Sequence, residues 1–325
     1  MDSAAQRPQG AAQVSSALDA PEPFHYRFHH LGEALVLPPS PQWTRRFAVG
    51  GPLVADLVLV HGMGAQRSSR LEHIEIWRAA LAKGLSNVRA RTIYPDLEFA
   101  FYGHLYNDGK AGDGPLLRIS DLSPGFEQDF AVAMANSLCD GPAAEPDKLD
   151  VPGSLQWAMR LLERHQVMDG VQASIIRYIK QVNRYLTDVA FKRKVWTEMS
   201  AAMATRPRAV VAHSLGTVVA YDWLRSNPNT TASSFITLGS PLGFRGVRKL
   251  HLGLDGSPAP WPNGVTTWLN VAAKRDPVAM VKVLNGLFGG TIDDKPGANR
   301  RGAAHDAMEY LQNCRTAEGV AKALG

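Results

Sequence analysis

The chain has 325 residues, 45% of them hydrophobic and 20% charged, enough to fill one large core or two modest ones in an ordinary soluble globular protein. Its formal charge of +5 is spread over 35 basic and 30 acidic residues without a dense basic block interleaved with aromatics, so we expect no nucleic-acid partner. Cys139 and Cys314 belong to no CxxC motif or Cys/His cluster, which excludes a disulfide framework and a zinc site, and we expect two buried or half-buried thiols.

Residues 1–45 are rich in proline and of low complexity, and they predict a disordered tail followed by an extended arm. The first twenty residues contain no continuous apolar stretch of the kind found in signal peptides. No later run reaches the roughly 18 apolar residues that a membrane span requires. We therefore expect a cytoplasmic protein with no membrane span.

Short apolar runs alternate with helical segments in the rest of the chain. Such alternation is typical of a parallel sheet covered on both faces. We expect one α/β domain over 46–325, with a mostly parallel sheet flanked by helices. The predicted strands are 57–60, 97–102, 209–212, 235–239 and 266–272.

Between Gly103 and Arg206 the strand signals vanish and helical periodicity takes over. This change predicts a helical insertion, or cap, at about 105–205, ahead of the third strand. Three helices are expected in it: one with Ser123 as N-cap and Pro124 as its first residue, one near 154–165, and one from about 171 toward 205.

The segment AHSLG, residues 212–216, joins the third strand to an amphipathic helix and places Ser214 at the turn. Such a turn lifts a hydroxyl above the carboxyl edge of the sheet, beside the free N–H groups of the helix N-terminus. The residues two before and two after the serine must be small; they are Ala212, where glycine is usual, and Gly216. The pattern favours a nucleophilic serine over one that merely caps the helix.

The segment HGMG follows the first predicted strand and reaches the same edge of the sheet. In acyl-transfer enzymes such a turn donates a backbone N–H to the oxyanion, and we expect Met63 to do so together with Leu215 after the serine. His61 is expected to orient this turn by hydrogen bonding rather than to act as a base. Further residues that could line the site are Tyr102 and His104.

Asp276 follows the last predicted strand and precedes Pro277. A carboxylate there can accept Nδ1–H from a histidine and stabilise the imidazolium. The alternative is that Asp276 starts a turn or caps a helix over 278–284. Rival acids are Asp255 and the Asp293–Asp294 pair, the latter expected in a solvated polar loop.

His305 lies in a glycine-containing loop at the start of a predicted helix and is the best candidate for a base. Ser214, Asp276 and His305 follow one another as nucleophile, acid and histidine, the order expected when this kind of fold carries the triad. The residues together predict a Ser-His-Asp hydrolase.

The segments HGMG, AHSLG, TLGSPLG, WLNVAAKRDPV and HDAMEYL resemble the alpha/beta-hydrolase superfamily, particularly its lipase and esterase branches, over roughly residues 50–325. The resemblance implies the alpha/beta-hydrolase fold and a carboxylic ester hydrolase, a serine esterase or lipase, that needs no metal or organic cofactor. It also implies that the turn of Ser240 and Pro241 borders the acyl site. The insertion precedes the nucleophile strand, whereas caps often follow the strand after it, so the substrate class stays open.

Two alternative functions remain at this point. The chain could be a hydrolase-like interaction module without turnover, with a protein partner bound by the insertion or by residues 1–45. It could also be an amide or peptide hydrolase, since the same groups serve that reaction.

The substrate is expected to be a small-molecule or lipid ester. A mobile apolar cap favours a lipid or long-chain ester, and a rigid cap packed shut favours a small ester or an acylated partner. The side chains that would either face an acyl chain or form a core within the insertion are Met134, Trp157, Met159 and Leu162.

Overall fold

The structure is a computed structural model of the chain. It describes residues 54–65, 69–107, 117–139, 154–165, 172–252, 257–300 and 302–325. The tail and arm expected at 1–45, and the rival acid Asp255, lie outside these ranges.

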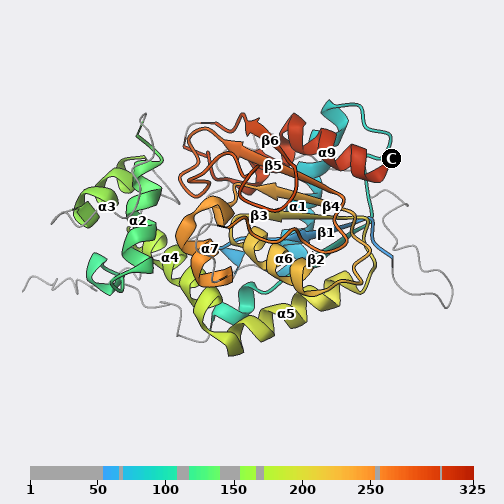
Figure 1. Cartoon of the computed structure of the whole chain (residues 1–325). Coiled ribbons are helices and arrows are strands. Elements are labelled where there is room, and N and C mark those ends of the chain that lie inside the picture. The colour runs from blue at the N-terminus through green and yellow to red at the C-terminus, as the bar shows by residue number, and fades with distance from the viewer. Residues whose placement is uncertain are drawn as a thin grey trace, which may run out of the picture. The chain divides into compact units, whose positions relative to one another are not determined.

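A parallel sheet forms the centre of the described residues (Figure 1). Its strands are β1 (Leu57–Val60), β2 (Leu97–Ala100), β3 (Ala209–His213), β4 (Ser234–Leu238), β5 (Thr267–Ala273) and β6 (Ile292–Gly297). Their order is β2-β1-β3-β4-β5-β6, and all neighbouring pairs are parallel. The expected α/β class with a parallel sheet flanked by helices is confirmed.

The strand β6 contradicts the sequence analysis, which placed Asp293 and Asp294 in a solvated loop. It pairs with β5 at one end of the sheet, and most of its side chains are half-buried or exposed, so it shows no apolar alternation. The Asp294 carboxylate accepts hydrogen bonds from the Asn270 side chain and from the backbone N–H groups of Leu284 and Asn285. These contacts give Asp294 a structural role.

Helices cover both faces of the sheet (Figure 1). One face packs against α1 (Arg70–Asn87), α8 (Ala307–Gln312) and α9 (Cys314–Leu324), and the other against α5 (Val189–Met203) and α6 (Leu215–Ser226). Successive strand residues point to opposite faces, so Leu57 and Leu59 join the first core whereas Val58 and Val60 join the second. The fully apolar sequence of β1 follows from burial on both sides.

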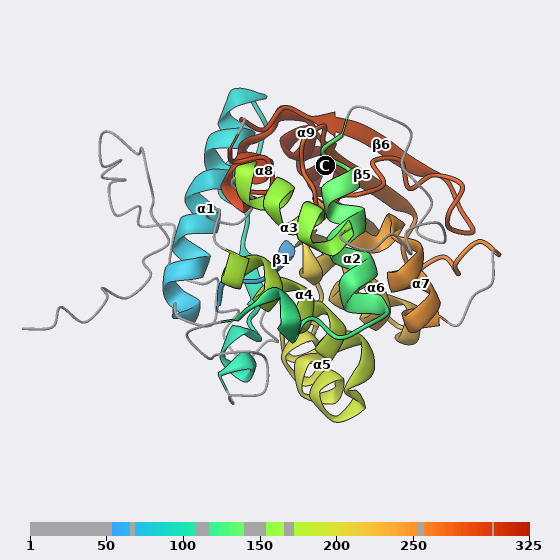
Figure 2. The same ribbon diagram turned by 90° about the vertical axis from the view of Figure 1, so that its left-hand side faces the viewer.

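Between β2 and β3 the described residues contain helices and no strand. They include α2 (Phe126–Asn136), α3 (Ser154–Arg164) and α4 (Gln172–Thr187), which lie in front of the sheet in Figure 2. Met134, Met159 and Leu162 are fully buried in this region, whereas Trp157 is 40% exposed. Three of the four apolar side chains singled out in the sequence therefore pack in a core.

Two expected helix boundaries in this region were wrong. The segment from 171 toward 205 forms two helices rather than one, because Asp188 has an extended backbone and its carboxylate caps α5 by accepting from Phe191 N–H at 2.9 Å. The helix α2 begins at Phe126 after Gly125, whose φ of 84° suits glycine, so Ser123 is not the N-cap.

The cysteine expectation was also wrong, since Cys139 and Cys314 are both exposed. A further helix, α7 (Arg245–Leu252), follows β4 and contacts α2 and α4. Across the described ranges, no helix combines the length and apolar character needed to cross a membrane.

Candidate active site

The candidate site lies where the strand order of the sheet reverses. The chain passes from β1 to β2 on one side and later from β3 to β4 on the other, and β1 and β3 are neighbours. Loops at the carboxyl ends of two such strands diverge and leave room for polar groups. Ser214 directly follows β3, and His61 directly follows β1.

Ser214 has a strained backbone. Its φ of 56° and ψ of −130° are unusual for a residue other than glycine, and such conformations cost about 1–3 kcal/mol. The turn packs tightly, because a Cβ at Gly216 would lie 2.4 Å from the backbone oxygen of His61. Ala212 fits at the other small position, where it is fully buried. This turn holds the Ser214 hydroxyl at a fixed place beyond the sheet.

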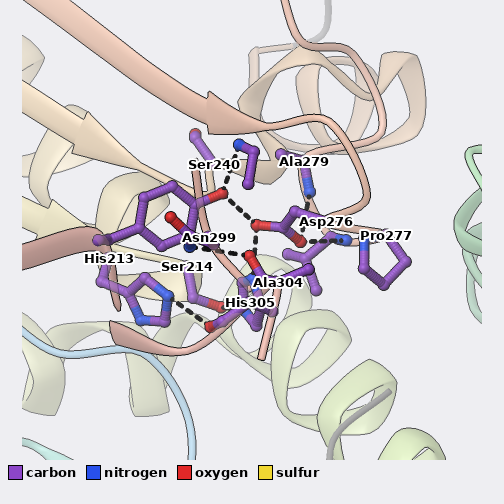
Figure 3. A network of polar contacts seen from close by, with 12 residues as sticks. His213, Ser214, Ser240, Asp276, Pro277, Ala279, Asn299, Ala304 and His305 are labelled. Carbon is purple, nitrogen blue, oxygen red and sulfur yellow. Dashed lines mark hydrogen bonds and ion pairs between the residues drawn. The ribbon is translucent and has the colours of Figure 1, made fainter. Parts of the chain in front are cut away.

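Ser214, His305 and Asp276 form a hydrogen-bonded chain (Figure 3). The Ser214 Oγ lies 2.8 Å from His305 Nε2, and His305 Nδ1 lies 2.9 Å from Asp276 Oδ2. Ser214 is 1% exposed and Asp276 is 0% exposed, whereas the His305 side chain is 13% exposed. The three residues expected from the sequence are thus brought together with the imidazole between the hydroxyl and the carboxylate.

The Asp276 carboxylate is held on both oxygens. Its Oδ1 accepts from the N–H groups of Val278 and Ala279 at 2.8 and 3.3 Å, and its Oδ2 accepts from Tyr310 at 2.6 Å as well as from His305. A turn therefore does start at Asp276, but no helix follows over 278–284.

The electrostatic surroundings keep Asp276 ionised. Burial by itself raises the pKa of this carboxyl group, but the charges of His305 and Lys282 and the hydrogen bonds from His305 and Tyr310 lower it to about 2. The Lys282 ammonium group donates to the backbone carbonyl of Asp276. A charged acceptor is therefore available to His305 at neutral pH.

Gly239, at the end of β4, leaves room for the acid and the histidine. Its φ is +56°, and a Cβ there would lie 2.6 Å from Asp276 Oδ2, 2.9 Å from Tyr310 Cε2 and 3.1 Å from His305 Nδ1. Only glycine fits without displacing these groups.

The residues expected to stabilise an oxyanion lie next to Ser214. A Cβ at Gly62 would lie 2.6 Å from Ser214 Cβ, so the turn that contains Met63 packs directly against the serine. Leu215 is the first residue of α6, and the first N–H groups of a helix lack partners within the helix.

His61 has the hydrogen bonds of an orienting residue. Its Nε2 accepts from the backbone N–H of Tyr102 at 3.0 Å, and its Nδ1 lies 2.5 Å from the Gly62 carbonyl, to which it donates in that tautomer. The Tyr102 hydroxyl donates to the His61 carbonyl, and the two rings are stacked at 4.1 Å. Burial lowers the pKa of His61 to about 3, so this imidazole is neutral.

His104 and Ser240 have other surroundings. The His104 side chain is 51% exposed and lies 3.8 Å from Glu198 of α5. Ser240 is buried, with its hydroxyl 2.7 Å from that of Thr217 in the first turn of α6. Ser240 thus supports the helix behind the Ser214 turn, while His104 is half exposed on the surface.

The sequence analysis treated His213 as a variable position within the turn. Its Nε2 lies 3.0 Å from the backbone carbonyl of His305, and the two rings are 4.7 Å apart (Figure 3). Burial, with a smaller contribution from the charge of His305, lowers the pKa of His213 to about 3. A neutral His213 therefore donates from Nε2 and fixes the backbone that carries His305.

Two tyrosines of the site were also missed. Tyr178 of α4 is 0% exposed, and its hydroxyl oxygen lies 3.4 Å from Ser214 Oγ. Tyr310 of α8 contacts Asp276 as described above. In the sequence Tyr178 is one of several apolar positions at helical spacing on α4, so no local signal set it apart.

No protein-family model matches this chain, and no curated protein is significantly similar to it in sequence.

Proposed function

We propose that this chain is a serine hydrolase with the alpha/beta-hydrolase fold and that it cleaves carboxylic esters. The supporting observation is the chain of hydrogen bonds from Ser214 Oγ through His305 to Asp276, with spacings of 2.8 and 2.9 Å. The strained backbone of Ser214 adds support, since strain of this kind is concentrated at functional sites. The parallel sheet, with the serine directly after β3, is compatible with that fold.

In the proposed reaction, Ser214 Oγ attacks the acyl carbon while His305 Nε2 takes the hydroxyl proton. Asp276 accepts the Nδ1–H and stabilises the imidazolium. The tetrahedral intermediate then collapses, the bond from carbon to the leaving oxygen breaks, and His305 returns the proton to that oxygen. Water attacks the acyl-enzyme with His305 again as base, which releases the carboxylic acid and restores Ser214.

The backbone N–H groups of Met63 and Leu215 are proposed to hold the negative charge that develops on the acyl oxygen. Loss of one donor of this kind costs about a hundredfold to a thousandfold in kcat. The proposed chemistry uses no metal or organic cofactor.

A small-molecule or lipid ester remains the proposed substrate. Ser214 is 1% exposed, and α4 supplies a side chain against it, so an ester must displace part of the covering helices to enter. The acyl-chain preference therefore depends on how far these helices can move.

Labelling with a fluorophosphonate probe tests the proposal. Intact-mass analysis should show one adduct on the wild type and none on Ser214→Ala, and His305→Ala should react far more slowly. Turnover of esters and of matched amides, each from short to long acyl chains, then defines the substrate class. Absence of an adduct and of turnover in folded wild type would contradict the proposal and favour an interaction module.

The acid assignment has its own test with a matched control. Asp276→Asn should lower kcat by about 10⁴, as loss of the carboxylate does in other enzymes with this triad. Asp294→Asn changes a carboxylate that is also hydrogen-bonded but contacts Asn270 and a neighbouring loop. It should leave kcat close to wild type, and the reverse result would make Asp294 the acid.

A further inference from the structure

The hydroxyl group of Tyr178 is placed against the atom that attacks the substrate in the proposed reaction. It reaches Ser214 Oγ at 3.4 Å from α4, a helix of the insertion, whereas Ser214 and Asp276 follow strands β3 and β5. The Tyr178 ring also lies edge-on to His305, with ring centroids 6.3 Å apart. Tyr178 thus touches both the proposed nucleophile and the proposed base.

The hydrogens of this group can be assigned from its neighbours. His305 Nδ1 faces a charged carboxylate and carries the proton of the neutral imidazole, so Nε2 is an acceptor. The single hydroxyl proton of Ser214 is then used in the 2.8 Å bond to Nε2. The longer 3.4 Å contact has the geometry of a donation from Ser214 Oγ to the Tyr178 oxygen. Since the serine proton is directed at Nε2 in the shorter bond, this contact leaves the Tyr178 hydroxyl proton for another acceptor.

The surroundings of Tyr178 keep its proton in place. Burial raises its pKa far above the usual value near 10, with a smaller opposing effect from the Ser214 hydrogen bond. The phenol is therefore a neutral donor at neutral pH, and it does not compete with His305 as a base.

We propose that Tyr178 is a catalytic residue whose hydroxyl group donates a hydrogen bond to the oxygen that becomes negatively charged on the acyl group. This inference rests on the proposed function. In an acyl group bound to Ser214 Oγ, the carbonyl oxygen is attached to the same carbon as Oγ and therefore lies close to Oγ. A hydrogen-bond donor 3.4 Å from Oγ can reach this carbonyl oxygen. Tyr178 would then add a side-chain donor to the backbone donors of Met63 and Leu215.

The contacts of α4 explain how this donor is held. Two and five residues after Tyr178 on α4, Lys180 and Asn183 both bind the buried carboxylate of Glu127 on α2, at 3.3 and 2.7 Å. Close to Tyr178, α4 is thus fixed to α2. In the proposed reaction, these contacts hold Tyr178 against Ser214.

Comparison of Tyr178→Phe with Tyr106→Phe tests the inference. Tyr106 is a matched control, because its buried hydroxyl donates to the Gln181 carbonyl of the same helix at 3.2 Å and has no part in the proposed reaction. We expect Tyr178→Phe to lower kcat about 100-fold with little change in KM, and to weaken inhibition by a trifluoromethyl ketone by a similar factor. Tyr106→Phe should lower stability without these effects.

Three results would overturn the inference. Equal kcat values for the two variants would assign Tyr178 a packing role, and a raised KM with unchanged kcat would assign it to substrate binding alone. Failure of the probe to label Ser214 in the wild type would contradict both the proposed function and this inference. If the wild type is labelled but Tyr178→Phe has the same kcat as the wild type, only the inference is contradicted.

If Tyr178→Phe does not fold, 3-fluorotyrosine and 3,5-difluorotyrosine placed at position 178 provide the test. They keep the hydroxyl group and change its acidity. A donor to a developing charge makes kcat depend on that acidity, and an unchanged kcat across the series would contradict the inference.

Discussion

The Tyr310 hydroxyl donates a hydrogen bond of 2.6 Å to Asp276 Oδ2, the oxygen that also accepts from His305. The backbone N–H of Ala273 in turn donates to the Tyr310 oxygen at 2.8 Å. Tyr310 therefore joins the end of β5 to the acid that follows it. Its hydroxyl fixes the direction in which the carboxylate faces the imidazole.

Tyr310→Phe should lower both stability and turnover. Removal of the hydroxyl leaves the Ala273 N–H without its acceptor, which costs about 1–3 kcal/mol of unfolding free energy. The less constrained carboxylate should reduce kcat about tenfold, corresponding to roughly 1.4 kcal/mol. Tyr221→Phe, whose hydroxyl donates to the Pro260 carbonyl, is the control expected to affect stability alone. Equal kcat values for the two variants would contradict the role of Tyr310.

Gly239→Ala should abolish most activity, because the added methyl group meets Asp276, Tyr310 and His305 at 2.6–3.1 Å. Gly286→Ala is a matched control: Gly286 also has a positive φ, of +86°, but a Cβ there meets nothing within 4 Å. The control should show only the backbone penalty of about 1–2 kcal/mol. Urea unfolding and kcat, measured for both variants, separate the two effects. Similar losses of kcat would refute the steric explanation.

Buried His61 and His213 should make the protein less stable in mild acid. Burial, with smaller contributions from neighbouring charges, lowers both pKa values from 6.5 to about 3. Between these pH values the unfolded chain binds protons that the folded chain does not, so stability is full above pH 6.5 and falls as the pH drops toward 3. At pH 5 each histidine should cost about 2 kcal/mol.

Urea unfolding at pH 7 and pH 5 checks this dependence. His213→Gln removes one of the two titrating groups, so the loss of stability between the two pH values should shrink by about 2 kcal/mol. An unchanged pH dependence in that variant would show that His213 titrates normally in the folded protein.

Glu127→Gln should loosen the contact between α2 and α4. Glu127 is 4% exposed and accepts from Lys180, Asn183 and the backbone N–H of Ser123. Loss of its charge should reduce the unfolding free energy by about 1–3 kcal/mol and lower kcat, since Tyr178 lies on the same helix. Glu318→Gln breaks an exposed pair with Arg315 and should change stability by less than about 1 kcal/mol. Equal destabilisation by the two variants would contradict the role of Glu127.

The strands next to the site could be predicted because each is buried on both faces. The expected segments 57–60 and 209–212 agree with β1 and β3 within one residue, and both have fully buried side chains. β6 was missed because it lies at an edge, where Asp293, Lys295 and Pro296 are tolerated. The break at Asp188 was missed because the apolar spacing continues across it, and only the cap to Phe191 marks the new helix.

Ser214, Asp276 and His305 could be named from the sequence because each follows a local pattern: a strand-to-helix turn, a strand end, and a glycine-containing loop before a helix. Tyr178, His213 and Tyr310 could not, because their positions carry no such pattern. Tyr178 is 36 residues from Ser214 in the chain, and His213 meets a carbonyl 92 residues away.

The sequence by itself determined the alternation of strands and helices, the parallel sheet, and the residues at the strand ends, because burial periodicity and turn chemistry act over a few neighbouring residues. Tertiary structure decided which buried side chains surround those residues. Contacts such as Tyr310 with Asp276, Gly239 beside both acid and histidine, and α4 against Ser214 depend on how distant elements pack. Each arises from the free energy of the whole core, and no single segment encodes it.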